Sequence, residues 1–280
     1  MKAAIVGAGV IGGGWAARFL LNGWDVAIHD PALQRSESGA MERLNSLLDN
    51  ARHSLPALYD RPLPPEGTLI HAGSLGEAID GARWIQESVP ERLDIKHATR
   101  DAILKDAPDA AIIASSTSGF TPSTLLDGTD RPGRMLVAHP FNPVYLLPLV
   151  ELVPSPKTEQ EAVATATDLL TGIGMKPLVV RREIDAHIAD RLLEAVWREA
   201  LWLVNDGIAT TQEIDDAIRY GFGLRWAQMG LFETYRLAGG ADGMHHFLKQ
   251  FGPALQWPWT KLMDVPELTD DLIDTIARQS

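Results

Sequence analysis

A glycine-rich turn near the start of the chain is the sequence feature that most constrains the fold. Gly7-Ala8-Gly9-Val10-Ile11-Gly12 has the spacing G-x-G-x-x-G and follows a short apolar run over residues 3–6. That run is typical of a buried parallel strand, and residues 12–21 predict a helix closed by Asn22-Gly23. A strand, a glycine turn and a helix in this order predict the first βαβ unit of a dinucleotide-binding sheet.

The turn and an acidic residue beyond it form a candidate cofactor site. The glycines permit a tight turn, close approach of a pyrophosphate and close helix–strand packing, and the helix N-terminus offers free N–H groups. Asp30 lies 18 residues after Gly12, at the end of a predicted strand over 25–29. A carboxylate there binds the ribose hydroxyls and repels a 2′-phosphate, so the sequence predicts NAD rather than NADP. The alternative is that the glycine turn merely connects a strand to a helix, and that Asp30 is only a solvent-exposed polar residue at the end of a strand.

Strands and helices alternate as far as about residue 182. Further strands are expected at 69–71, 83–87, 110–114, 135–138, 149–153 and 177–181, helices at 33–55, 92–106 and 159–171, and a proline-rich loop over 55–67. This alternation predicts an α/β fold, a Rossmann-type doubly wound and mostly parallel sheet.

The character of the sequence changes beyond residue 182. No convincing strand remains, residues 186–205 predict a long amphipathic helix, and Thr210-Thr211-Gln212-Glu213 is a capping box that predicts the start of another. Five of the eight tryptophans lie in this part, namely Trp197, Trp202, Trp226, Trp257 and Trp259. We therefore expect an NAD-binding domain over 1–182 and a smaller all-helical domain over 183–280.

Composition excludes several classes of protein. The chain has no cysteine, which excludes disulfides, a thiolate nucleophile and Cys-ligated metal. The net charge of −12 argues against nucleic-acid binding. No apolar run is long enough for a membrane helix, and the glycines near the start make a poor signal peptide, so we expect a cytoplasmic protein. His245-His246 are adjacent and point about 100° apart on a helix, so no metal site is expected.

Polar side chains at predicted strand ends form a candidate chemical site. Ser115-Ser116-Thr117-Ser118 follows one strand, His139 ends another, and Glu151 lies on the next. Open α/β sheets bind ligands at this edge. A histidine there can accept the proton of an alcohol while hydride leaves its carbon, and a carboxylate can hold the imidazole ring. From the residues alone, His139 as a strand-end cap and Glu151 as a structural ion pair remain an open alternative.

Together with the glycine motif, the segments Ser-x-Thr-Ser at 115–118 and His-x-Phe-Asn-Pro at 139–143 resemble the 3-hydroxyacyl-CoA dehydrogenase family. Ser118 lies 21 residues before His139, the spacing that this family shows between its catalytic serine and histidine. The resemblance implies His139 as general base and Glu151 as its partner. It implies Ser118 as hydrogen-bond donor to the substrate oxygen and as part of the cofactor site.

Further roles follow from the same resemblance. Glu91 and Lys96 match the family's cofactor contacts, although Arg92 replaces the usual asparagine, and Asn142 is expected near the nicotinamide. Asp190 stands where the acyl-CoA enzymes place a catalytic-site asparagine, and a charge there should change substrate preference. The resemblance also implies a homodimer formed through the helical domain.

The expected substrate is a small 3-hydroxy acid. Residues 223–260 are most similar to the members of this family that oxidise L-carnitine, which favours L-carnitine as the substrate. Gulonate and a short-chain 3-hydroxyacyl-CoA are alternative substrates. The alternative class is a non-catalytic, crystallin-like NAD-binding protein. Proteins bind a trimethylammonium group over aromatic faces. The candidate substrate residues are Trp226, Phe232 and Tyr235 for the cation, Asp190 or Glu233 as a countercharge, and Arg225 for the carboxylate.

Overall fold

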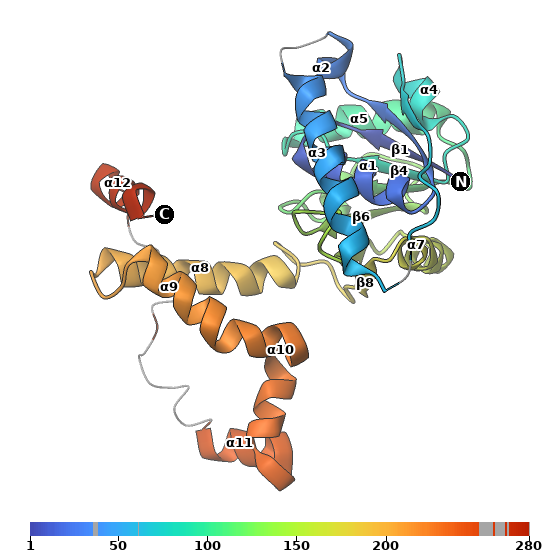
Figure 1. Ribbon diagram of the computed structural model, residues 1–280. Helices are drawn as coiled ribbons and strands as arrows, with labels where there is room; N and C mark the ends of the chain where they lie inside the picture. Colours follow the sequence, from blue (N-terminus) through green and yellow to red (C-terminus); the bar gives the residue numbers. More distant parts are fainter. Residues whose placement is uncertain (36–38, 61, 252–259, 261–266, 268, 280) are drawn as a thin grey trace. The chain divides into compact units, whose positions relative to one another are not determined.

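The computed structural model describes residues 1–35, 39–60, 62–251, 260, 267 and 269–279. The chain divides into two compact units, Met1–Asp190 and Arg191–Ser280, and each is described by itself. The first carries all the strands of the described chain, and the second is helical (Figure 1).

The first unit is built on an eight-stranded sheet with the order β3-β2-β1-β4-β5-β6-β7-β8. The strands are β1 Lys2–Val6, β2 Asp25–His29, β3 Leu69–His71, β4 Trp84–Glu87, β5 Ile112–Ser115, β6 Met135–Pro140, β7 Leu149–Pro154 and β8 Lys176–Val179. The order reverses direction at β1, and all neighbours are parallel except β6 and β7. The predicted Rossmann-type, mostly parallel sheet is confirmed.

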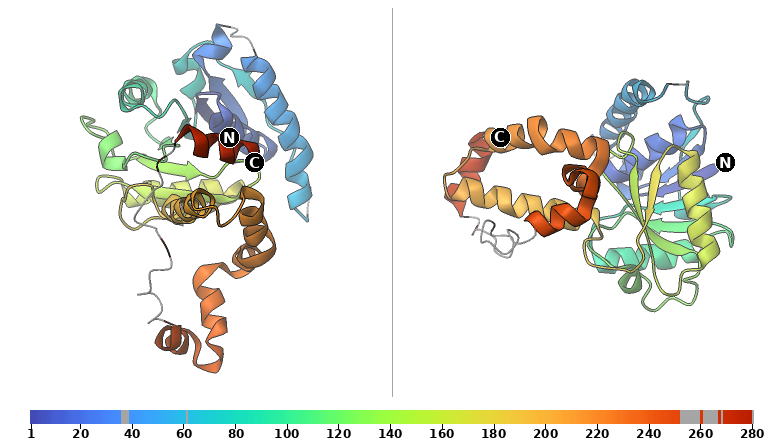
Figure 2. Two further views of the ribbon diagram at one scale, coloured as in Figure 1. Left: turned by 90° about the vertical axis from the view of Figure 1, so that its left-hand side faces the viewer. Right: turned by 90° about the horizontal axis from the view of Figure 1, so that it is seen from below.

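Helices cover both faces of this sheet (Figure 2). They are α1 Val10–Leu21, α2 Pro31–Gln34, α3 Ala40–Ser54, α4 Leu75–Ile79, α5 Leu93–Asp106, α6 Pro122–Leu125 and α7 Gln160–Gly172, with a 3-10 turn η1 Leu55–Leu58. Alternate residues of β1 enter different cores, because side chains alternate across a strand. Ala3 and Ile5 pack with α1 and α3, whereas Ala4 and Val6 pack with α4 and α5.

The helix expected over 33–55 is two helices. Asp30 caps α2 by accepting a hydrogen bond from Ala32 N, with Pro31 in the first turn. Gly39 is the N-cap of α3 and has a φ of 77°, in the left-handed region that glycine adopts readily. The loop expected over 55–67 begins with the short turn η1.

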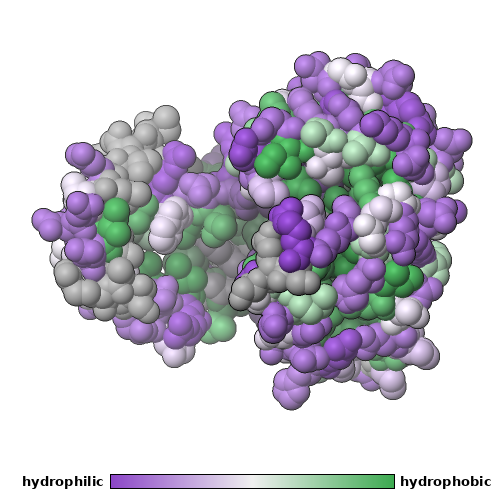
Figure 3. Space-filling view, turned by 90° about the horizontal axis from the view of Figure 1, so that it is seen from above, coloured by the Kyte–Doolittle hydropathy of each residue, from purple (hydrophilic) through white to green (hydrophobic). Residues whose placement is uncertain are grey.

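The second unit contains most of α8 Ala189–Asn205, followed by α9 Thr211–Ala217, η2 Ile218–Phe222, α10 Gly223–Ala238, η3 Gly240–Asp242, α11 Gly243–Phe251 and α12 Asp270–Gln279. The predicted capping box is present, since Thr210 and Glu213 each accept from the other's backbone N–H. Large apolar side chains reach the surface of this unit, including Leu192, Trp197 and Phe232, and hydrophobic residues are visible there in Figure 3. Among the described residues, no helix combines the length and apolar character needed to cross a membrane.

Candidate active site

A groove runs along the glycine turn at the carboxyl ends of β1 and β2. Its volume is about 1010 Å³, and its lining includes Gly7, Gly9, Val10, Ile11 and Asp30. Gly7 has a φ of 100°, and a Cβ on Gly12 would lie 1.8 Å from Gly7 O, so neither position accepts a larger residue. A Cβ on Gly9 would meet nothing within 4 Å, so the backbone there is open to the groove.

The N-terminus of α1 opens beside this groove. Gly9 is its N-cap and supplies no side-chain hydrogen bond, and the first turn carries no acidic residue. The free N–H groups and the positive end of the helix dipole therefore favour an anion such as a pyrophosphate. The residues present fit a dinucleotide.

Asp30 ties the glycine turn to α2. Its Oδ2 accepts a hydrogen bond from Ala8 N at 2.6 Å, and its Oδ1 accepts one from Ala32 N at 2.7 Å. A carboxylate has further lone pairs, so these bonds leave acceptor sites for a ribose hydroxyl. Arg35 lines the same groove.

His139 and Glu151 are direct partners across the one antiparallel pair of the sheet. This register explains their separation of twelve residues, since paired residues project side chains on the same face. His139 Nδ1 lies 3.1 Å from Glu151 Oε2, and both side chains are buried. Burial opposes ionisation of Glu151, but hydrogen bonds from His139 and from the N–H groups of Ala189 and Ile188 outweigh it and hold the Glu151 pKa below its usual range.

The first turn of α8 approaches the same histidine. Glu151 Oε1 accepts hydrogen bonds from Ile188 N at 2.9 Å and Ala189 N at 3.0 Å, so the carboxylate binds the start of this helix. Asp190 Oδ2 then lies 3.5 Å from His139 Nε2. The imidazole therefore has one carboxylate at each nitrogen.

His187 is a neighbour of this site that the sequence reasoning missed. Its side chain is fully buried, its ring centroid lies 5.2 Å from that of His139, and its Nε2 lies 3.3 Å from Thr117 O. Burial lowers the His187 pKa despite the hydrogen bond to Thr117. A neutral His187 ring donates from Nε2 to Thr117 O and contacts the His139 ring, so it connects the loop that carries Ser118 to His139. A single histidine outside any recognisable pattern gives no signal in the sequence.

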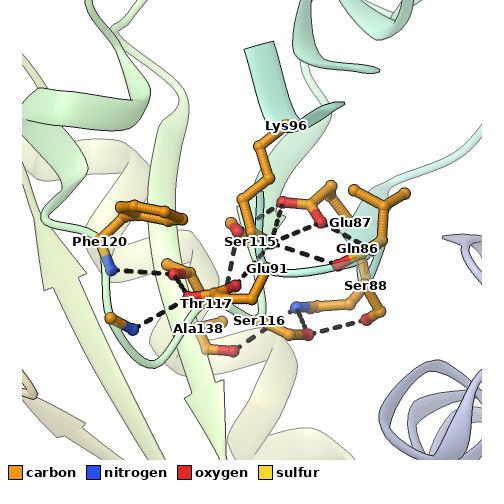
Figure 4. Close-up of polar contacts among 12 residues, drawn as sticks. Gln86, Glu87, Ser88, Glu91, Lys96, Ser115, Ser116, Thr117, Phe120 and Ala138 are labelled. Carbon is orange, nitrogen blue, oxygen red and sulfur yellow. Dashed lines mark hydrogen bonds and ion pairs between the residues drawn. The ribbon is translucent and has the colours of Figure 1, made fainter. Parts of the chain in front are cut away.

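A buried charged network underlies the neighbouring strand ends (Figure 4). Lys96 Nζ lies 2.9 Å from Glu87 Oε1, and the two side chains are only 2% and 7% exposed. Ser115 Oγ donates to Glu87 Oε2 at 2.5 Å, which joins β4, β5 and α5. The sequence reasoning missed Glu87, although an acid at the end of a buried strand was a usable signal.

Glu91 connects this network to the loop after β5. It lies 3.2 Å from Lys96 and accepts hydrogen bonds from Thr117 Oγ1 and Gly119 N. Burial opposes ionisation of Glu91, but these bonds and the Lys96 charge outweigh it and lower the Glu91 pKa. Ser118 lies between the two residues that Glu91 holds and is exposed.

The remaining candidates fall in two places. Asn142 is exposed in the turn between β6 and β7. Arg225, Trp226, Phe232 and Tyr235 all lie on α10 and are at least partly exposed, and Trp226 packs on Phe222 at 4.6 Å. Glu233 is exposed and faces Arg236 at 3.7 Å. Trp257 and Trp259 lie outside the described residues.

The doubly wound sheet, its glycine-lined groove and the carboxylate-backed histidine define a dinucleotide-binding dehydrogenase architecture. Residues 2–184 match the model of the 3-hydroxyacyl-CoA dehydrogenase NAD binding domain, and residues 187–272 match that of the 3-hydroxyacyl-CoA dehydrogenase C-terminal domain. The chain belongs to the 3-hydroxyacyl-CoA dehydrogenase family. The resemblance inferred from the motifs and the prediction of NAD are thereby confirmed.

Curated relatives are similar to the whole chain. An L-carnitine dehydrogenase/betainyl-CoA thioesterase of Ruegeria pomeroyi is 64% identical over 99% of this chain and 56% of its own length. An L-carnitine dehydrogenase of Mesorhizobium japonicum is 54% identical over 100% of this chain and 76% of its own length. The chain spans about half the length of the first of these relatives.

Solved structures share the fold. An NAD+-dependent 5-formyl-3-hydroxy-2-methylpyridine-4-carboxylic acid 5-dehydrogenase has a TM-score of 0.81 at 30% identity and covers 98% of this chain and 85% of that chain. A (S)-3-hydroxybutyryl-CoA dehydrogenase from Ralstonia eutropha has a TM-score of 0.62 at 22% identity, covering 99% and 93%. The latter similarity concerns the fold alone.

Proposed function

We propose that this chain oxidises the 3-hydroxyl group of L-carnitine to the ketone with NAD as hydride acceptor. The observation that carries the chemistry is the His139 ring, which has Glu151 at Nδ1 and presents Nε2 at the edge of the sheet. The choice of substrate is supported by the names of relatives that are 52–64% identical over nearly the whole chain.

In this proposal each residue of the dyad has a separate task. Glu151 accepts the Nδ1 hydrogen of His139 and so fixes the tautomer that leaves a lone pair on Nε2. Nε2 takes the hydroxyl proton as the C–H bond breaks. Ser118 donates a hydrogen bond to the same substrate oxygen, where negative charge develops. A bound nicotinamide supplies the acceptor for the hydride.

The groove beside α1 holds the cofactor in this proposal. Gly7, Gly9, Val10, Ile11 and Gly12 present backbone to the pyrophosphate, and Asp30 binds the adenosine ribose. Glu91, Lys96, Ser118 and Asn142 complete the cofactor site. Glu91 and Lys96 contribute to the cofactor site by holding the loop that carries Ser118, in addition to contacting the cofactor directly.

The helical domain, residues 183–280, is proposed to supply the rest of the substrate site and a homodimer interface. Trp226, Phe232 and Tyr235 would contact the trimethylammonium, and Arg225 the carboxylate. Exposed apolar side chains such as Leu193 and Trp197 support an interface, since contiguous apolar surface marks such contacts. We place the enzyme in the cytoplasm.

NADH formation with a panel of alcohols tests the proposal. L-Carnitine, gulonate and 3-hydroxybutyryl-CoA are compared by kcat/KM at fixed NAD, and we expect L-carnitine to be preferred. Preference for gulonate or the thioester would overturn the substrate and leave the chemistry of Ser118, His139 and Glu151. No oxidation of any alcohol, with NAD still bound, would favour the non-catalytic class.

A further inference from the structure

We propose that the Asp190 carboxylate is the countercharge that selects a substrate carrying a quaternary ammonium beside the reacting carbon. This inference rests on the proposed function and assigns substrate specificity to one residue at the base itself. Its starting point is the 3.5 Å separation between Asp190 Oδ2 and His139 Nε2, the atom that must receive the hydroxyl proton.

The position of Asp190 is fixed by the backbone around it. Glu151 accepts hydrogen bonds from Ile188 N and Ala189 N, the two residues that precede Asp190 in the chain. The same Glu151 carboxylate holds His139 through Nδ1. The buried Glu151 side chain therefore positions both the His139 ring and the start of the helix that carries Asp190. The distance between Asp190 and His139 follows from these shared contacts.

The Asp190 carboxylate has no cationic partner among the described residues. Within the described part of the chain, no lysine or arginine lies within ion-pair distance of it, whereas Glu91 pairs with Lys96 and Glu194 approaches Arg198. Its side chain is 23% exposed, so water screens it only in part. In the tautomer that the proposed function requires, with the hydrogen on Nδ1, His139 also offers Asp190 no hydrogen at Nε2. The charge at this position is therefore open to a ligand cation.

The chemistry of L-carnitine places a cation at this point. Its nitrogen is two bonds from the carbinol carbon, a separation of about 2.5 Å. The hydroxyl on that carbon must come within about 2.6–3.2 Å of His139 Nε2 for proton transfer. A reactive pose that turns the ammonium, rather than the carboxylate, toward the start of α8 therefore brings the cation close to Asp190. A 3-hydroxyacyl thioester has no charge near its carbinol carbon, and the family's asparagine at this position is neutral.

A purely catalytic role for Asp190 is a distinct alternative. A carboxylate at Nε2 could stabilise the imidazolium formed when His139 takes the proton, and that effect does not depend on a charge in the substrate. The two roles separate when the substrate charge and the Asp190 charge are removed independently and together, because only direct recognition couples them.

The experiment is a four-cornered comparison. Wild type and Asp190→Asn are assayed for NADH formation with L-carnitine and with its neutral analogue, in which tert-butyl replaces trimethylammonium. We expect Asp190→Asn to reduce the preference for L-carnitine over the analogue by about 10-fold or more, as for a close charge pair. Equal losses for both substrates would overturn the inference. Failure of the wild type to oxidise L-carnitine would instead overturn the proposed function and the inference with it.

A binding measurement gives a readout besides turnover. Calorimetry with NAD present compares 4-trimethylammoniobutanoate, which lacks the hydroxyl, with its tert-butyl counterpart. Asp190→Asn should weaken the binding of the cationic ligand more than that of its neutral counterpart. An unchanged ratio of the two affinities would contradict the inference. Glu194→Gln is the matched control, because it removes an acid one turn along α8 that lies 3.7 Å from Arg198, and it should leave both preferences unchanged.

Discussion

Glu151 faces His139 directly across the β6–β7 pair, with Oε2 3.1 Å from Nδ1. Glu151→Gln keeps an amide oxygen that can still accept from Ile188 N and Ala189 N, but it removes the negative charge behind the imidazole. We expect kcat to fall by about 10-fold or more while NAD affinity is unchanged, because the tautomer and orientation of His139 are no longer fixed.

The double variant Glu151→Gln/His139→Ala supplies the check on that explanation. If Glu151 acts through His139, the double variant is no slower than His139→Ala alone, because residues that act as a unit are not additive. A further loss in kcat would show that Glu151 acts separately from the base.

Asp30 governs the choice between NAD and NADP in our account. Asp30→Asn keeps an oxygen for one of the two backbone N–H groups that Asp30 now binds and removes the charge that repels a 2′-phosphate. The ratio of kcat/KM for NAD over NADP should fall in Asp30→Asn and fall further in Asp30→Ala. A ratio equal to that of wild type in both variants would take Asp30 out of the cofactor site.

Lys96 stabilises the sheet unit through its buried pair with Glu87. Lys96→Met leaves the Glu87 carboxylate buried without its cation, which should cost about 3–5 kcal/mol of unfolding free energy. The measurement is denaturant unfolding, followed by tryptophan fluorescence. The double variant Lys96→Met/Glu87→Gln should recover part of the lost unfolding free energy. The control Arg131→Met removes the cation of an exposed ion pair and should change the unfolding free energy little.

The fully buried His187 makes stability depend on pH. Its pKa is lowered by burial, so below the usual histidine pKa of about 6.5 the unfolded chain binds a proton that the folded chain does not. Its contribution is therefore complete above that value and decreases as pH falls below it. His187→Phe should flatten the loss of thermal stability between about pH 6.5 and 5. The exposed control His53→Gln should keep the wild-type slope, and an unchanged slope in His187→Phe would refute the assignment.

The sequence predicts the sheet and its glycine turn because each depends on local patterns, whereas the pairing of His139 with Glu151 was implied by the family resemblance. Short apolar runs, turn glycines and polar strand ends are all visible in the letters. The 3.5 Å approach of Asp190 to His139 depends on how the segment after β8 folds back to Glu151, which no local pattern encodes. The role of His187 comes from burial beside distant partners, which its residue type does not indicate, whereas Glu87 is an acid at the end of a buried strand and could have been recognised.

The central claim is that His139 is the general base for oxidation of L-carnitine. It is tested most directly by initial rates of NADH formation from L-carnitine with wild type and His139→Ala, alongside NAD binding by both. We predict a kcat lower by about 10²-fold or more in His139→Ala, with NAD affinity retained. Near wild-type turnover of L-carnitine by His139→Ala would contradict it.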